Sequence, residues 1–295
     1  MNRKTVYLKD AVSLLPRRPQ NAHKGTFGTA GLICGSFGMA GAAVLSAKAA
    51  IRTGVGIARM IIPKSIYNIA AVAVPEAVFK FLPETENGVF DGENPEINSA
   101  LNEAAKGCNS LLIGCGCTNN FSVRVLVKKA VLFAKTPLII DADGINCIAP
   151  DIEFIKQCKA ETIITPHPRE AARLLNTTVR EIENDRDGAA LKLAQMSGAV
   201  SVLKGRGSLI ATPSGELFIC PYGNSGMATA GSGDVLSGII AALLAEGLST
   251  ENAAVCGVIL HAAAGDIAAK RFSKTAMNAE DIAESLAALF SEIEG

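Results

Sequence analysis

The 295-residue sequence contains no tryptophan, three tyrosines and three histidines. An aromatic platform for stacking nucleic-acid bases is therefore not expected. Neither sign of charge is in excess, because 28 basic and 28 acidic residues give a net charge of zero. Since a nucleic-acid interface needs a basic patch or stripe, we expect no nucleic-acid partner.

Long apolar runs are missing as well. We find no stretch of 18 or more uncharged apolar residues, which a membrane-spanning helix would need. The first 25 residues have neither the apolar core nor the small-residue cleavage site of a signal peptide. We therefore expect a soluble cytoplasmic protein without a membrane partner.

The eight cysteines form no C-x-x-C pair, and no histidine lies near the closest two in sequence. This spacing does not indicate a metal site, and a chain of this length needs disulfides less than a small secreted protein does. We therefore predict small, buried, apolar side chains at Cys34, Cys108, Cys115, Cys117, Cys147, Cys158, Cys220 and Cys256.

Apolar residues make up 49% of the sequence, and short β-branched runs alternate with longer alanine-rich runs. Strands that are apolar throughout and separated by helices indicate a mostly parallel sheet covered on both faces. With no linker and no repeat, we predict one domain over 1–295, in which 1–25 form an N-terminal arm or a first helix. The predicted strands cover 31–35, 57–63, 110–116, 137–143, 162–168, 200–205, 208–212 and 215–220. The predicted helices cover 40–54, 65–73, 122–134, 168–175, 178–197, 231–247, 249–271 and 278–293.

Polar residues gather where the predicted strands end. Asp141 and Asp143 end one strand, His167 follows the next, and Lys204 follows a third. A charged side chain inside a buried strand needs a partner, whereas a strand end can open on a cleft. Because ligands of parallel sheets bind beyond the carboxyl ends of the strands, we expect the binding site there.

The segment Gly231-Ser232-Gly233-Asp234 stands directly before a long apolar helix. Amides of the first helical turn lack intrahelical partners and suit a phosphate, and glycine lets that phosphate approach the main chain. An N-cap formed by Ser232 or Asp234 would satisfy the same amides. The segment is neither a Walker A loop nor G-x-G-x-x-G, so both interpretations stay open.

Three further groups have more than one interpretation. Asp141 and Asp143 are two residues apart and can hold Mg²⁺ through water, or they cap the next helix with help from Asn146. His167, between two prolines, is a general base, a ligand donor or a structural residue. The basic glycine-rich turn 204–208 contacts nucleotide phosphate or ribose, or it is an ordinary hairpin turn.

Six sequence segments that occur in a fixed order identify a protein family more specifically than any single segment does. They are HKGTFGTAGLICGS, MAGAAVLSAKAAIRTGVG, IDADGIN, ITPHPREAARL, LKGRGSLIATPSG and ATAGSGDVLSGIIAALLAEG. Together they resemble the ADP/ATP-dependent NAD(P)H-hydrate dehydratases, a branch of the ribokinase-like superfamily. The resemblance runs from about residue 20 to about residue 290.

The resemblance implies a three-layer α/β/α ribokinase-like fold with a mostly parallel central sheet. It also implies repair of NADH or NADPH that has taken up water across the C5–C6 bond of the nicotinamide ring. Such an enzyme phosphorylates the 6-hydroxyl with ADP or ATP, which carries Mg²⁺, and then eliminates phosphate. With ADP the products are NAD(P)H, AMP and phosphate. Family members often form tetramers, so we expect a homo-oligomer.

Roles for individual residues follow from the same resemblance. Asp234 is expected to take the hydroxyl proton, and the amides of Gly231, Ser232 and Gly233 to bind the transferred group. Gly233 is also expected against AMP, and no residue is expected to bind a metal directly. The implied nucleotide-binding turn is Lys204, Gly205, Arg206, Gly207 and Ser208. The implied substrate contacts are Ala42, Gly116, Asp141, Asn146, His167 and Asp234.

The sequence departs from the family pattern at four positions. Arg169 and Ser208 replace a common glycine and a frequent threonine, while Cys115 and Gly144 replace a common proline and a frequent alanine. We do not expect the epimerase domain that often precedes this module, because the twenty or so leading residues cannot encode it.

Two other functions are compatible with the segment 231–234, which we call the glycine loop. One is a small-molecule kinase of the same superfamily, acting on a hydroxymethylpyrimidine, a thiazole or a sugar. The other is a regulator that binds nucleotide without catalysis. His167-Pro168 and the turn 204–208 favour the dehydratase over the kinase, and Asp234 argues against the regulator, which needs no acid.

Overall fold

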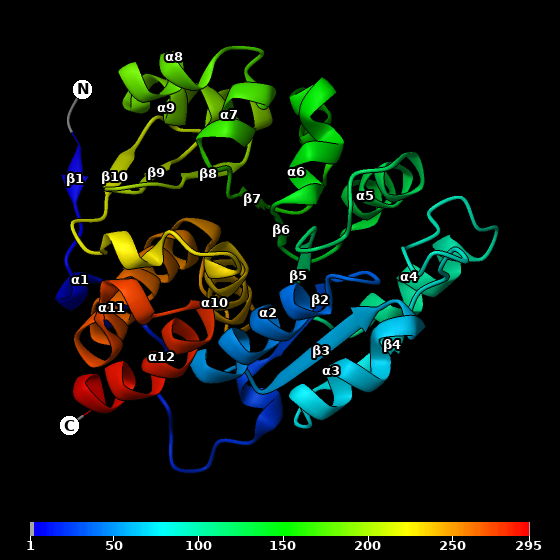
Figure 1. Ribbon diagram of the computed structural model, residues 1–295, viewed down its shortest axis with the longest axis horizontal. Helices are drawn as coiled ribbons and strands as arrows, with labels where there is room; N and C mark the ends of the chain where they lie inside the picture. The colour runs from blue at the N-terminus through cyan, green and yellow to red at the C-terminus, as the bar shows by residue number, and fades with distance from the viewer. Residues whose placement is uncertain (1–2, 295) are drawn as a thin grey trace.

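A ten-stranded sheet forms the middle layer of the molecule, and helices cover both of its faces (Figure 1). The computed structural model describes residues 3–294. The sheet order is β1-β10-β9-β8-β7-β6-β5-β2-β3-β4, and neighbouring strands are parallel except where β9 is antiparallel to β8 and β10. The predicted three-layer arrangement with a mostly parallel sheet is confirmed. The strands are β1 (Lys4–Thr5), β2 (Thr29–Ile33), β3 (Ile57–Ile62), β4 (Val78–Phe81), β5 (Ser110–Ile113), β6 (Leu138–Ile140), β7 (Thr162–Ile164), β8 (Val200–Leu203), β9 (Leu209–Ala211) and β10 (Leu217–Ile219).

Two groups of helices enclose the sheet, one on each face (Figure 1). On one face lie α1 (Leu8–Leu14), α2 (Ala40–Thr53), α3 (Tyr67–Ala73), α10 (Ser232–Ala245), α11 (Thr250–Ala276) and α12 (Ala279–Glu294). On the other lie α4 (Ile97–Ala105), α5 (Phe121–Phe133), α6 (Asp143–Ile148), α7 (Pro168–Leu174), α8 (Val179–Asn184) and α9 (Arg186–Ser197). Short 3-10 segments are η1 (Lys24–Phe27), η2 (Lys64–Ile66), η3 (Ala149–Gln157) and η4 (Ser225–Met227).

Strand residues alternate between two hydrophobic cores. In β5, Leu112 packs into the core under α2 and α10, whereas Leu111 and Ile113 pack into the core under α5. A strand that is buried on both faces is apolar at nearly every position, which is why these strands are visible in the sequence as near-continuous runs. Seven cysteines are buried as predicted, Cys158 is half-buried, and all eight are free thiols.

Helices α2 and α10 pack together unusually closely. A Cβ added to Gly238 of α10 would lie 2.2 Å from the carbonyl oxygen of Ser46 in α2, so only glycine fits there. The alanine-rich sequence of α2 therefore allows close packing against α10. This contact fixes the start of α10, which carries the glycine loop, relative to the end of β2.

Within the described residues, helix α11 is long and apolar enough for a membrane span, although no such span was expected from the sequence. By length and composition its residues qualify, with a mean hydropathy of 1.4 over the best 18-residue window. However, 78% of that window is buried inside the protein, and the helix contacts α1, α10 and α12. We therefore assign α11 to the hydrophobic core.

Several predicted boundaries were wrong for local reasons. The predicted helix 178–197 is broken at Asp185, which has non-helical backbone angles and accepts a hydrogen bond from the amide of Gly188 at 2.9 Å to start α9. The predicted strand 137–143 ends at Ile140, and Ala142 has a positive φ of 50°. Asp141 and Asp143 therefore do not share one side of a strand.

Of the two alternatives predicted for the N-terminal segment 1–25, an arm or a first helix, the described residues contain the helix, α1, and a strand in addition. Residues 1–2 lie outside the described part of the chain. Strand β1 adds to the sheet edge beside β10, and the buried Ala11 of α1 joins the core against α11. Strand β4 and helices α4 and α6 are further elements that the sequence did not predict.

Candidate active site

The predicted polar residues meet at one edge of the sheet. Strands β8, β7, β6, β5 and β2 are consecutive neighbours, and their carboxyl ends carry Lys204, His167, Asp141, Cys115 and the loop that leads to Ala42. The order of the strands reverses between β5 and β2, and a parallel sheet opens a crevice at such a point.

A buried ion pair is the centre of this edge. Nζ of Lys204 lies 2.7 Å from Oδ1 of Asp141, and the hydroxyl of Ser237 donates to Oδ2 of Asp141 at 2.7 Å. The side chain of Asp141 is 1% exposed and that of Lys204 is 17% exposed. Burial acts to raise the pKa of Asp141, but the charge and hydrogen bond of Lys204 outweigh it and lower the pKa. Asp141 is therefore an anion and Lys204 a cation at neutral pH.

Asp234 lies in the first turn of α10, close to that pair. Burial, and next the negative charge of Asp141, raise the pKa of Asp234 to about 7. Two carboxylates that share one site titrate apart in this way, because both cannot ionise freely. Asp141 stays charged, and Asp234 is poised to gain or lose a proton near neutral pH, as a general base requires.

The start of α10 leaves main-chain amides free. The N-cap is Gly231, with a positive φ of 89°, and no side chain of the described residues caps the helix. The capping interpretation for Ser232 and Asp234 is therefore wrong. The amide of Ser232 donates to the carbonyl of Thr229 at 3.4 Å, whereas within residues 3–294 the amides of Gly233 and Asp234 have no acceptor.

Gly233 brings this turn directly against the cation. A Cβ added to Gly233 would lie 3.3 Å from Nζ of Lys204 and 3.9 Å from Oδ2 of Asp141. The free amides, the helix dipole and the ammonium group thus act on one small volume. All three favour an anion such as a phosphoryl group.

A cavity of about 770 Å³ opens beside this turn. His167 lines this cavity together with the start of α10 and the basic turn 204–208. The first turn of α10 is therefore open to the same cavity as His167 and the basic turn. The other predicted residues on the wall are Lys204, Gly205, Arg206, Ser208, Ser232 and Gly233. Gly207 and Gly231 support these turns with positive φ values rather than lining the cavity.

His167 has a structural task in addition to its place on the wall. Its Nδ1 accepts hydrogen bonds from the amides of Arg169 and Glu170 and so caps α7. Burial, and next the charge of Lys204, lower the pKa of His167 to about 4, so the ring is neutral. A neutral ring that accepts at Nδ1 carries its proton on Nε2, which lies 3.3 Å from Oε1 of Glu170. This arrangement does not suit a general base, and Arg169 is exposed away from the cavity wall.

The remaining predicted residues divide between two places. Ala42 and Gly116 are in contact, because a Cβ added to Gly116 would lie 2.7 Å from that of Ala42. Asn146 in α6 instead accepts a hydrogen bond from Arg173 at 2.6 Å. Asp143 accepts one from the amide of Thr118 at 2.8 Å, so it points away from Asp141.

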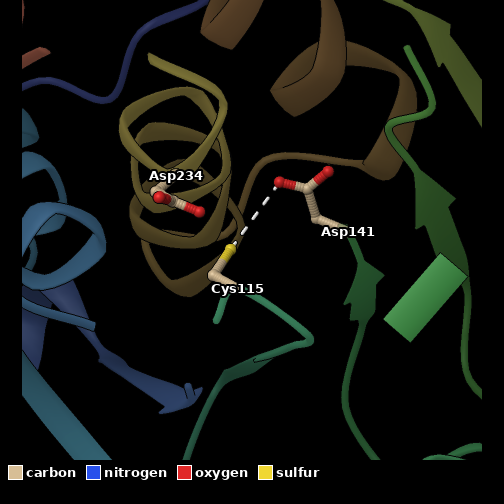
Figure 2. A group of neighbouring side chains, drawn as sticks. All are labelled: Cys115, Asp141 and Asp234. Atoms are coloured by element: carbon tan, nitrogen blue, oxygen red, sulfur yellow. Dashed lines mark hydrogen bonds between the residues drawn. The ribbon is translucent and has the colours of Figure 1, made fainter. Parts of the chain in front are cut away.

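A metal held by the protein does not fit this site. Ligand atoms of Cys115, Asp141 and Asp234 lie within 4.8 Å of one another (Figure 2). However, Asp141 is already neutralised by Lys204, and the pKa of the Cys115 thiol is raised well above its usual value, so the thiol keeps its proton. Mg²⁺ prefers oxygen ligands, and a neutral thiol is a poor substitute.

Comparison with known proteins decides the family. A family model described as NAD(P)H-hydrate dehydratase matches residues 30–288. This chain belongs to the NAD(P)H-hydrate dehydratase family. The ADP-dependent (S)-NAD(P)H-hydrate dehydratase of Neisseria meningitidis is 39% identical over 254 residues, covering 85% of this chain and 80% of that protein.

A second relative of this chain is the bifunctional NAD(P)H-hydrate repair enzyme Nnr of Moorella thermoacetica. It is 39% identical over 282 residues, which cover 96% of this chain and 53% of the relative. The chain thus spans about half the length of the bifunctional relatives it matches. A solved Bacillus subtilis ADP/ATP-dependent NAD(P)H-hydrate dehydratase, co-crystallized with ATP and Mg²⁺, superposes with a TM-score of 0.86 at 27% identity and covers 99% of both chains. The expected ribokinase-like fold is confirmed.

Three polar residues of this NAD(P)H-hydrate dehydratase family member were not predicted as part of the site. Ser237 bonds Asp141, and the buried Glu170 lies 4.0 Å from Nζ of Lys204, with its pKa raised to about 7 by burial. His261 lies on the cavity wall, 3.3 Å from the hydroxyl of Ser232. A single polar residue within the apolar run of α11 was the one sequence signal for His261.

Proposed function

We propose that this chain is an ADP-dependent (S)-NAD(P)H-hydrate dehydratase that restores NADH or NADPH from the hydrated cofactor. The observation that carries the proposal is the position of Asp234. Its carboxylate stands in the first turn of α10, next to unpartnered amides and a buried lysine. A base beside an anion site is what transfer of a phosphoryl group to an alcohol requires.

The first step is phosphoryl transfer from the nucleotide. The 6-hydroxyl oxygen of the hydrated ring attacks the terminal phosphorus of ADP, and the bond from that phosphorus to the bridging oxygen breaks. AMP leaves, and Asp234 takes the hydroxyl proton. The amides of Gly233 and Asp234 and the ammonium of Lys204 stabilise the charge on the transferred group.

The second step is elimination of phosphate. Hydroxide is a poor leaving group because the pKa of water is about 15.7, whereas the second pKa of a phosphate ester is about 6. The lone pair of the ring nitrogen expels phosphate from C6, and loss of a proton from C5 restores the C5–C6 double bond. The protein has to add the phosphate, hold the ring and exclude water.

The two substrates are proposed to occupy adjacent volumes. The turn from Lys204 to Ser208 and the face of Gly233 bind the nucleotide, which carries Mg²⁺ with it. Ala42 and Gly116 contact the hydrated ring on the other side of Asp234, since Cys115 connects Gly116 to the acidic cluster. His167, Asp141 and Asn146 are proposed to border the ring from the ends of β7 and β6.

We further propose a cytoplasmic homo-oligomer, a tetramer as in the family resemblance. Its support is an apolar surface at the sheet edge formed by α3 and β4. Ile69 and Val72 of α3 are 61% and 84% exposed, and Val78 and Phe81 of β4 lie beside them on the outermost strand. An exposed edge strand with apolar side chains is usually covered in solution.

The test uses purified protein, Mg²⁺ and hydrated NADH with ADP or ATP. Formation of NADH is followed by the absorbance of the reduced nicotinamide ring. We expect absorbance to rise with ADP and to stay flat without nucleotide or with Asp234→Asn. Nucleotide consumption on hydroxymethylpyrimidine, thiazole or sugar substrates without NADH formation would instead identify a kinase. Nucleotide binding without turnover on any of these substrates would identify a regulator.

A further inference from the structure

His261 is a buried polar residue of the core helix α11 that takes no part in the reaction described above. Helix α11 packs against α10 (Figure 1), and His261 is 9% exposed and lines the cavity of about 770 Å³. Its Nε2 lies 3.3 Å from Oγ of Ser232, the first residue of α10. This hydrogen bond connects the core helix to the glycine loop.

Ser232 offers the cavity its hydroxyl rather than its main-chain amide. The amide donates to the carbonyl of Thr229 at 3.4 Å and is therefore occupied. In the described part of the chain, the hydroxyl has a single hydrogen-bond partner, His261. Ser232 lines the same cavity as Gly233 and Lys204. The hydroxyl thus lies at the edge of the volume in which the free amides and the ammonium group favour an anion.

The direction of this hydrogen bond decides what the hydroxyl can do. Burial lowers the pKa of His261 to about 4, so the ring is neutral and carries one proton, on Nδ1 or on Nε2. If Ser232 donated to Nε2, the lone pairs of Oγ would face the cavity and repel an anion. If Nε2–H donates to Oγ, the hydroxyl proton is available to a phosphoryl oxygen. An anion site requires the second arrangement, because a donor to a charged oxygen makes the stronger bond.

We propose that His261 is a positioning residue for nucleotide binding: its Nε2–H donates to Oγ of Ser232 and so holds that hydroxyl as a donor to the terminal phosphoryl group of ADP. The hydroxyl then acts beside the amides of Gly233 and Asp234. Neither residue exchanges a proton with the substrate. The proposal rests on the proposed function for the identity of the nucleotide, whereas the hydrogen bond itself does not.

Four variants test the chain of contacts through the dissociation constant of ADP with Mg²⁺, measured by calorimetry. Ser232→Ala removes the donor to a charged group and should raise the Kd about tenfold. His261→Phe keeps a ring but removes its N–H, and should raise the Kd about threefold or more. In the double variant the Kd should equal that of Ser232→Ala alone, since His261 acts through the hydroxyl. His261→Gln retains an N–H donor and should bind ADP within about twofold of the wild type.

Ile259 provides the control for loosening of α11. It is fully buried on the same helix and does not line the cavity. Ile259→Val removes one methylene group from the core, so the melting temperature should fall. Because the hydrogen bond to Ser232 is untouched, we expect the Kd for ADP to stay at the wild-type value.

The protonated nitrogen of His261 can be observed directly. The chain is labelled with ring-¹⁵N histidine, and the His261 signals are assigned by their loss in His261→Gln. The ¹⁵N chemical shifts distinguish a protonated from an unprotonated ring nitrogen. We expect the proton on Nε2 and an unprotonated Nδ1.

These measurements separate the inference from the proposed function, since none of them needs hydrated NADH. A proton on Nε2, together with the expected order of Kd values, supports the inference even if the wild type forms no NADH. A proton on Nδ1, an unaltered Kd in Ser232→Ala or His261→Phe, additive losses in the double variant, or a wild type that does not bind ADP would overturn it, even if NADH is formed.

Discussion

Nζ of Lys204 lies 2.7 Å from Oδ1 of Asp141, and this ion pair joins the end of β8 to the end of β6 across the end of β7. The pair places a fixed positive charge beside the first turn of α10. It also keeps Asp141 ionised, and the charge of Asp141 contributes to the raised pKa of Asp234. One buried contact thus connects the proposed phosphoryl site to the pKa of Asp234, the proposed base.

Lys204→Met should strongly destabilise the fold, because it leaves the carboxylate of Asp141 buried without its cation. Breaking a buried pair from one side costs about 3–5 kcal/mol. We expect a loss of that order in the free energy of unfolding, measured with urea. Lys274→Met, at an exposed position on the cavity mouth, should change it little. A Lys204→Met protein as stable as the wild type would mean that the carboxylate of Asp141 can be buried without its cation at no cost in free energy, which would contradict this account.

Asp234→Asn should stabilise the fold, and the gain should depend on pH. The pKa of Asp234 is about 7 in the folded protein and 3.8 as the ordinary value. Ionisation therefore favours the unfolded chain, and the penalty grows as pH rises from 4 to about 7 and then levels off. The difference in free energy of unfolding between variant and wild type should follow this curve. Glu170 and Glu246, which also have raised pKa values, occur in both proteins and cancel. A difference that is constant with pH would show that Asp234 titrates normally.

Gly233→Ala tests the approach of the phosphate to the main chain. The new methyl group would lie 3.3 Å from Nζ of Lys204, in the volume assigned to the transferred group. We expect the KM for ADP to rise about tenfold or more, which corresponds to about 1.4 kcal/mol. The melting temperature should change little. An unaltered KM would place the nucleotide elsewhere in the cavity.

Gly238→Ala tests the contact between α10 and α2. Alanine normally stabilises a helix interior relative to glycine, but here its Cβ would lie 2.2 Å from the carbonyl oxygen of Ser46. We expect a loss of about 1–3 kcal/mol in the free energy of unfolding. Gly41→Ala, in the first turn of α2 with open space around it, should be neutral or stabilising. Equal effects of the two substitutions would contradict the close packing.

Much of the fold could be predicted because the sheet is buried on both faces. Strands β2, β5 and β8 each have one small buried hydroxyl residue and no charged residue, and the glycines at Gly54 and Gly247 mark real ends of helices. Strand β4 was missed because it lies at the sheet edge and is partly exposed, so its sequence VFKF lacks the same signal.

The site was harder to predict than the fold, because its contacts join distant segments. Sequence patterns placed Asp141, Lys204 and Asp234 at strand or helix ends, but they did not indicate that Asp141 pairs with Lys204 rather than acting beside Asp143. That outcome depends on the positive φ of Ala142, which no local propensity indicates. His261 comes from the core helix α11, where a lone histidine carries no motif.

The central claim is that the 6-hydroxyl oxygen of the hydrated cofactor attacks the terminal phosphorus of the nucleotide, with Asp234 as base. Hydrated NADH carrying oxygen-18 in that hydroxyl tests this most directly, with the released phosphate observed by ³¹P NMR during NADH formation. We predict that each phosphate carries one oxygen-18 atom and that Asp234→Asn slows its appearance about 10²-fold or more. Unlabelled phosphate, with the isotope found in water, would contradict the account.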